Sequence, residues 1–210
     1  EDVRQTVEFF LDKIGTHDVD EVRALIAGIH IETDSALGAV ATTMLARALS
    51  AFELVRDAER GRQYLGIALE IGDSFPWFHS ENGRPDTLVR KFIQASQNVF
   101  EEEIERHPVD MHKMRGIMRL LGYWSSQDTR SRRLKVIGHL LAKLLEDPPL
   151  VQVGVDCALE LLHIVIPKLK EAKQGILLLQ KFALRLLELQ PDNADAAAIG
   201  ARVLKRGGRR

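Results

Sequence analysis

The chain has 210 residues, of which 45% are hydrophobic, 28% are charged and 6% are aromatic, and its net charge is −1. This length is sufficient for one sizeable core or for two closely joined ones. The single cysteine, Cys157, excludes an intrachain disulfide and favours a reducing intracellular compartment, with cytoplasm, nucleus and mitochondrial matrix left open. No charge-free apolar run reaches the roughly 18–20 residues of a membrane span, so we expect no membrane partner.

The charges are divided unevenly along the chain. Residues 1–110 hold 21 Asp and Glu against 11 Lys and Arg, a net charge of −10, whereas residues 111–210 hold 9 against 18, a net charge of +9. An asymmetry of this size predicts an acidic partner for the C-terminal half. The alternative is that the two halves neutralise each other within the fold.

Apolar residues in the N-terminal part recur at spacings of three and four, which is the period of an amphipathic helix. Asp18, followed by Glu21 three residues later, forms an aspartate variant of the capping box, and Gly15 and Gly72 are placed to end helices. The pattern predicts an acidic helical segment over residues 1–72 with helices at 2–14, 19–29, 34–56 and 58–72.

Residues 73–85, with the sequence DSFPWFHSENGRP, form the one long irregular segment. Its aromatic side chains either plug the side of the core or project as anchors for a partner protein, since buried Trp and Phe side chains make strong anchors. The candidate partner anchors are Phe75, Trp77 and Phe78.

The helical period continues through a basic segment, residues 86–210, and predicts helices at 87–105, 111–123, 129–146, 150–166, 176–190 and 193–205. The two runs on either side of the polar joint 170–175 are apolar around most of their girth, which indicates burial on more than one side. We therefore expect residues 150–193 to form one central helical hairpin with four nearly buried residues, Leu162, Ile166, Leu179 and Leu186.

About ten helices with short connections predict an all-α fold with essentially no sheet, in which antiparallel hairpins stack as one continuous α-solenoid with a loop at 73–85. The segment Lys181–Ala196, KFALRLLELQPDNADA, resembles the end of a tetratricopeptide (TPR) repeat running into the next repeat. In that family the second helix closes with an "ALELDP"-like run, here Leu186–Pro191. The resemblance, or more broadly one to TPR/HEAT-type helical repeats, implies a binding scaffold without a chemistry of its own.

No nucleotide-binding, metalloprotease, CxxC or nucleophile-elbow motif is present in the sequence, so we expect no enzyme, cofactor, metal site or small-molecule substrate. His30, Glu32 and Asp34 alternate as metal ligands would on an extended segment, but polar residues before a helix cap are the simpler interpretation. A run of glutamates indicates a solvated acidic helix face: Glu101, Glu102, Glu103 and Glu105.

Basic residues recur at helical spacing in the C-terminal half. On the helix at 129–146 they form a stripe opposite the leucines, made of Arg132, Lys135, His139 and Lys143 and flanked by Arg130 and Arg133. Further basic residues lie on neighbouring helices: Arg115, Arg119, Lys181 and Arg185. The nine lysines and arginines of this set predict a basic groove for RNA phosphates or an acidic partner, and a solvated helix face is the alternative.

From these patterns we expect a non-catalytic helical-repeat scaffold in a multisubunit, RNA-associated assembly, whose basic half contacts RNA while other proteins of the assembly bind elsewhere. The first alternative is a pure protein adaptor of TPR type that binds an acidic peptide through the same basic residues. An enzyme is the third alternative and has the least support in the sequence.

Overall fold

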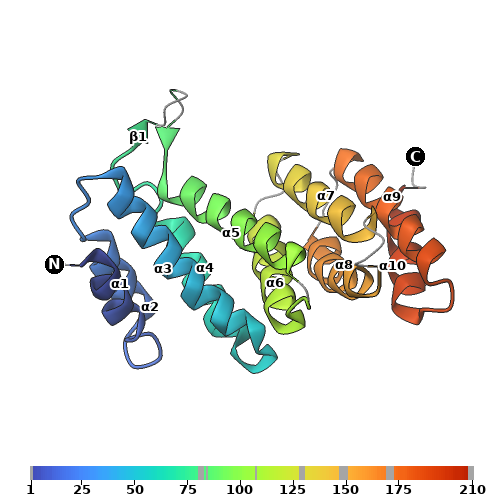
Figure 1. The fold of residues 1–210 in the computed structure, drawn as a ribbon, viewed down its shortest axis with the longest axis horizontal. Helices are drawn as coiled ribbons and strands as arrows, with labels where there is room; N and C mark the ends of the chain where they lie inside the picture. The colour runs from blue at the N-terminus through green and yellow to red at the C-terminus, as the bar shows by residue number, and fades with distance from the viewer. Residues whose placement is uncertain are drawn as a thin grey trace. The chain divides into compact units, whose positions relative to one another are not determined.

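The computed structural model describes residues 2–79, 83, 85–106, 108–127, 131–146, 151–168 and 173–207, and within these ranges the side chains of 131–135, 146, 151, 168, 173–178 and 204–207 are left out. The all-α prediction is confirmed, because the described residues form ten α-helices and little strand (Figure 1). The chain divides into two compact units, residues 1–120 and 121–210.

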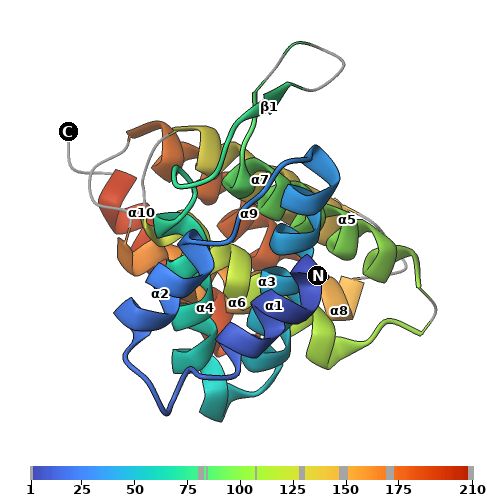
Figure 2. The same cartoon turned by 90° about the vertical axis from the view of Figure 1, so that its left-hand side faces the viewer.

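Unit 1 is built around a long helix against which most of its other helices pack. In chain order its helices are α1 (Val3–Leu11), α2 (Val19–Ala27), α3 (Asp34–Glu53), α4 (Ala58–Glu70), α5 (Leu88–Glu105) and the first part of α6 (Met111–Gln127), with a short 3-10 turn η1 (Val55–Asp57) after α3. Helix α3 packs against α1 on one side and α5 on the other. Helix α4 packs mainly against α3 and also contacts α5 and α2 (Figure 2).

The helix starts follow the cap residues that the sequence supplies. The Asp18 carboxylate accepts a hydrogen bond from the Asp20 N–H at 2.9 Å, which confirms the predicted cap of α2. The Thr33 and Thr87 hydroxyls accept N–H bonds in the same way at the starts of α3 and α5. Gly15, predicted as a helix end, has a φ of +103°, a value that L-residues with side chains rarely adopt.

Ion pairs join neighbouring helices within unit 1. Arg47 on α3 reaches Asp12 at the end of α1, with 2.8 Å between nitrogen and oxygen. Lys91 on α5 reaches Asp34 at the start of α3, also at 2.8 Å. A third pair, between Arg23 and Glu70, joins α2 to α4. Basic residues of this acidic unit are thus used to hold its helices together.

The loop predicted at 73–85 lies inside unit 1 and is less irregular than expected. Two strands of two residues each, β1 (Phe78–His79) and β2 (Pro85–Asp86), pair antiparallel and project from the helices (Figure 1). The prediction of essentially no sheet therefore needs this small correction. Extended residues on either side of a turn can pair with each other without help from a core, a local event that helical periodicity does not report.

Unit 2 contains the last part of α6 and helices α7 (Ser131–Glu146), α8 (Val151–Val165), α9 (Lys173–Leu189) and α10 (Ala194–Gly207), with a 3-10 turn η3 (Ile166–Lys168) after α8. Helix α7 packs against α8 and α9, and α9 packs most extensively against α10. Helices α8 and α9 touch each other only slightly, so the predicted central hairpin over residues 150–193 is wrong.

Glycine explains why α8 pairs with α7. A Cβ atom on Gly154 would lie 1.9 Å from the carbonyl oxygen of Leu144, so the backbones of α7 and α8 approach as only a residue without a side chain permits. On the other side of the unit, a Cβ on Gly200 of α10 would lie 2.8 Å from a methyl carbon of Leu187 on α9. The hairpins of unit 2 are therefore α7–α8 and α9–α10.

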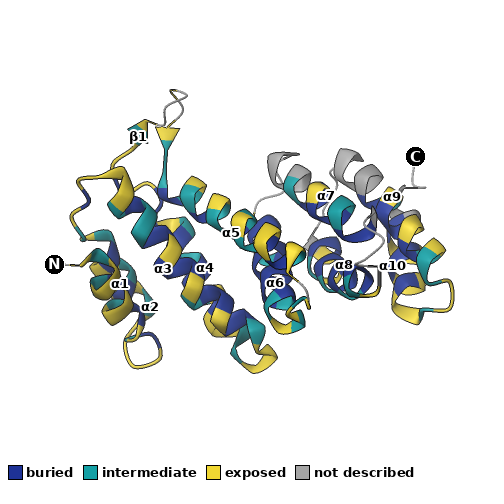
Figure 3. Cartoon of the chain, in the orientation of Figure 1, coloured by how far each residue is buried: buried dark blue, intermediate teal, exposed yellow. Residues whose placement is uncertain are grey.

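The predicted burial of the apolar runs is confirmed even though their pairing is not. Leu162, Ile166, Leu179 and Leu186 have exposed fractions of 0%, 3%, 1% and 0%. Among the described residues one helix, α3, is long and apolar enough to cross a membrane. Its apolar side chains, such as those of Leu37, Val40 and Met44, are fully buried in unit 1, as in the core helix of a globular domain (Figure 3).

Candidate functional site

The basic stripe predicted on the helix at 129–146 is described only in part. Arg130 lies outside the described residues, and so do the side chains of Arg132, Arg133 and Lys135, although the backbone of the last three belongs to α7. Lys143, near the end of the same helix, is half-buried. The merging of these residues into one basic surface therefore stays a prediction.

Two of the predicted cations lie together on α9. Lys181 and Arg185 are both exposed and one helical turn apart, and with Leu145, Phe182 and Glu188 they line a hollow of about 180 Å³. The Lys181 ammonium lies 5.5 Å from the centre of the Phe182 ring, within range of a cation–π interaction. Arg185 pairs with Glu188 at 3.1 Å, and this pair is too exposed to hold the guanidinium strongly.

Arg119 has a structural place in unit 1. Its exposed fraction is 8%, and its guanidinium donates hydrogen bonds to the carbonyl oxygens of Phe52 at 2.7 Å and Glu53 at 3.4 Å. The last carbonyls of a helix lack partners within the helix, and a cation there also suits the helix dipole. Arg119 thus caps α3, and its assignment to an RNA-binding or acidic-partner surface is wrong. Arg115, one turn earlier, is half-buried.

The three aromatic residues of the loop play different roles. Phe75 is only 4% exposed and plugs the core of unit 1, so its assignment as a partner anchor is wrong. Phe78 lies half-buried in β1, while Trp77 is 61% exposed. Among the predicted anchors, Trp77 is the one whose side chain is available to a partner.

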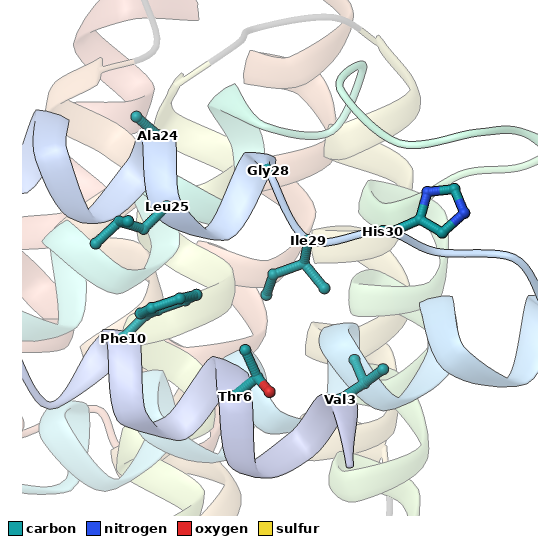
Figure 4. Close-up of a pocket in the computed structure, with 8 residues that line it drawn as sticks. All are labelled: Val3, Thr6, Phe10, Ala24, Leu25, Gly28, Ile29 and His30. Atoms are coloured by element: carbon teal, nitrogen blue, oxygen red, sulfur yellow. The ribbon is translucent and has the colours of Figure 1, made fainter. Parts of the chain in front are cut away.

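An apolar pocket of about 510 Å³ between α1 and α2 was not predicted from the sequence. Figure 4 shows Phe10 and Leu25 facing each other across it, with Ile29 beside them and the His30 ring turned away. Helical spacing groups Phe10 and Leu25 with the core-facing residues of their helices, so the sequence carries no separate signal for the pocket, and Phe9 next to Phe10 is not part of its lining. Phe9 is 61% exposed.

A groove of about 480 Å³ lies between α3 and α5 and was also not predicted. Small side chains line one wall, Thr42, Ala46 and Ser50 on α3, at successive spacings of four. Two carboxylates, those of Glu53 and Glu102, lie in the lining as well. This groove has charged side chains beside its apolar floor, whereas among the described residues the lining of the α1–α2 pocket has His30 as its one titratable side chain.

The acidic face predicted at 101–105 is wrong for Glu103, which is 1% exposed. Its carboxylate accepts the N–H of Asp110 at 2.8 Å and pairs with the Lys113 ammonium at 3.2 Å, because α6 begins directly over it. A buried carboxylate needs such partners to offset its lost hydration. Glu103 therefore fixes the start of α6.

The pKa shifts of Tyr64 and Arg23 arise from structural contacts within unit 1. Burial raises the pKa of the Tyr64 hydroxyl, and nearby Arg60 and Arg47 oppose this shift. A hydrogen bond to Glu70 raises the pKa of Arg23. His30 pairs with Glu32 at 3.1 Å on the surface, and no cluster of three metal-ligand side chains occurs within the described part of the chain.

A scan against protein-family models and searches of curated proteins and of solved structures found no match for this chain.

Proposed function

We propose that this protein is a non-catalytic helical-repeat scaffold in a multisubunit, RNA-associated assembly, and that basic residues of unit 2 contact the RNA backbone. Support for the repeat comes from alternate helices that pack side by side, α1 with α3 and α3 with α5 in unit 1, and α7 with α9 in unit 2. Stacked helical hairpins bring alternate helices together in this way. Such stacks offer extended surfaces on which partners assemble.

The observation that carries the RNA contact is the pair Lys181 and Arg185 beside the hollow on α9. At about 180 Å³ the hollow is smaller than the roughly 300–1,000 Å³ of most small-molecule sites, but it suits one phosphate or carboxylate group. Phe182 is only 3% exposed, so its ring cannot stack with a base. Contacts here would be to the backbone and would carry no sequence preference.

The test is an equilibrium titration of a labelled single-stranded oligouridylate with the whole chain at about 50 and 200 mM salt. The test variant is Lys181→Glu with Arg185→Glu. The matched control is Arg4→Glu with Arg62→Glu in unit 1, where Arg62 also belongs to an exposed pair, with Glu59 three residues away.

Loss of two phosphate contacts should make the slope of log affinity against log salt shallower by about 1.4, since each contact on a single strand contributes about 0.7. The control should keep the wild-type slope. Equal slopes for the wild type and the test variant would overturn the proposed contact.

The adaptor function with an acidic peptide remains the second candidate, because a carboxylate would fit the same two cations. A polyglutamate peptide in the same titration separates the two. Binding of the peptide without binding of the RNA would favour the adaptor.

A further inference from the structure

We propose that the groove between α3 and α5 is a separate binding site, and that it takes a basic amphipathic helix of a partner protein. The site lies wholly in unit 1 and shares no residue with the cations of α9. It can therefore be right or wrong independently of RNA binding.

The two walls of the groove run in the same direction. At one end Lys91 near the start of α5 pairs with Asp34 at the start of α3, and at the other end Glu53 and Glu102 both line the groove. Two helices aligned in this way leave a straight furrow between their side-chain ridges. From Thr42 to Ser50 the wall rises by eight helical steps, or about 12 Å, which is a little over two helical turns.

The floor of this furrow is apolar and its walls are low. Leu45 and Leu49 are 3% and 7% exposed, and Val99 is half-buried beside them. Ala46 is exposed on one wall and Ala95 half-buried on the other. Small residues facing outward let another backbone come close, and packed helices need axes about 8–10 Å apart.

The charge at one end determines what kind of helix fits. Among the described residues no ion-pair partner of Glu53 or Glu102 is found, and Lys113, the remaining charged residue of the lining, is held by Glu103 at 3.2 Å. Residues 1–120, which make up unit 1, hold 21 Asp and Glu against 14 Lys and Arg, a net charge of −7. Lys or Arg on the occupant would complement both the local carboxylates and the field of the unit.

The lining also favours a helix over an extended peptide. An extended peptide needs partners for its own backbone, whereas a helix satisfies its backbone internally. Two of the polar side chains here are already engaged: the Thr42 hydroxyl donates to the Gly38 carbonyl at 3.0 Å, and the Asn98 side-chain oxygen accepts from Gln94 at 3.0 Å. An amphipathic helix would place apolar residues at helical spacing on the floor.

The frame around the groove is preorganised. Arg119 ties α6 to the last carbonyls of α3, and Gly116 allows the two backbones to meet closely, since a Cβ there would lie 3.3 Å from the Glu53 nitrogen. Lys91 ties the other end of α5 to α3. A groove that keeps its shape spends less binding energy on ordering.

The probe is a synthetic lysine–leucine peptide of about four turns with leucines at helical spacing, labelled for fluorescence anisotropy with the whole chain. A peptide of the same composition in scrambled order, and one with glutamate in place of lysine, serve as comparison ligands. We expect the lysine–leucine peptide to bind at least tenfold more tightly than either.

Two variants test the site itself. Ala46→Arg fills the groove from an exposed position, and Glu102→Lys reverses one carboxylate, while Glu8→Lys makes the same charge change at an exposed position of α1. Each groove variant should lower the affinity for the lysine–leucine peptide about tenfold. Glu8→Lys should change this affinity less than twofold. With Glu102→Lys, the glutamate peptide should gain affinity.

Thermal melts confirm that the variants remain folded. The proposal is overturned if the wild-type chain binds the lysine–leucine peptide and the scrambled peptide with equal affinity. It is also overturned if Glu8→Lys loses as much affinity for the lysine–leucine peptide as the groove variants do. The double variant Lys181→Glu with Arg185→Glu should keep the peptide affinity, so failure of the groove and failure of the RNA contact are separable.

Discussion

The close approach of α7 and α8 predicts that Gly154→Ala destabilises unit 2. An added Cβ would lie 1.9 Å from the Leu144 carbonyl oxygen and 2.9 Å from its carbonyl carbon. Non-bonded carbon atoms pack best at about 3.5–4.0 Å, so the two backbones must separate by about 1.5 Å at this point. A backbone carbonyl in a helix cannot rotate away from the methyl group as a side chain can.

Two effects oppose each other in this substitution. Alanine is intrinsically favoured over glycine within a helix by about 0.8–1.0 kcal/mol. Overpacking costs about 1–3 kcal/mol, and contact with the backbone puts this site at the upper end. We therefore expect a net loss of about 2 kcal/mol in the free energy of unfolding. In a protein of this size that corresponds to a fall of about 4–8 °C in Tm.

The assay is denaturant unfolding followed by circular dichroism, with Gly66→Ala as the matched control. Gly66 lies inside α4, and a Cβ there would meet nothing within 4 Å, so this variant should gain up to about 1 kcal/mol. The two glycine-to-alanine changes should thus have opposite signs. A Gly154→Ala protein at least as stable as the wild type would refute the inferred close approach of α7 and α8.

Two further predictions concern unit 1. Asp110 caps α6 by accepting the backbone N–H of Lys113, which lowers its pKa from 3.8, so Asp110→Ala should cost about 0.5–2 kcal/mol at neutral pH. The ionised cap contributes fully above that ordinary value, and its contribution is lost as the pH falls through the lowered pKa, so the wild-type and variant unfolding free energies should converge in acid. Phe75→Ala should lower the free energy of unfolding by about 3–5 kcal/mol, whereas Trp77→Ala should change it by no more than about 0.5 kcal/mol. Thermal melts of the two variants check this, and equal losses of stability would contradict the different burial of the two side chains.

The helices could be predicted from the sequence because their causes are local. Apolar periodicity and cap residues such as Asp18 and Thr33 lie within the element they define. The partner of each helix is a property of distant residues and is harder to predict. Residues 150–193 show two apolar runs, but periodicity does not say which neighbour each run faces. Gly154, whose lack of a side chain decides the pairing, appears in a helical pattern only as a weak helix former.

The candidate site was less predictable than the fold for the same reason. Arg115 and Arg119 share one helix face, but only the tertiary structure shows that this face meets the end of α3, where Arg119 is buried. The α3–α5 groove is made by small and polar residues at helical spacing, which in one sequence look like an ordinary solvated face. Its function as a site depends on two helices separated by more than thirty residues.

Charge asymmetry has a different meaning in the two units. In unit 1 the basic residues Arg23, Arg47 and Lys91 join helices, and among the described residues no ion-pair partner of Glu53 or Glu102 is found. In unit 2 the exposed cations of α9 lie beside a shallow hollow that offers little apolar area. Contact with a phosphate chain there would depend mainly on counterion release and would weaken steeply with salt. A helix in the α3–α5 groove would also bury leucines on an apolar floor, and this part of its affinity persists when salt screens the carboxylates. Salt therefore separates the two modes of binding within one chain.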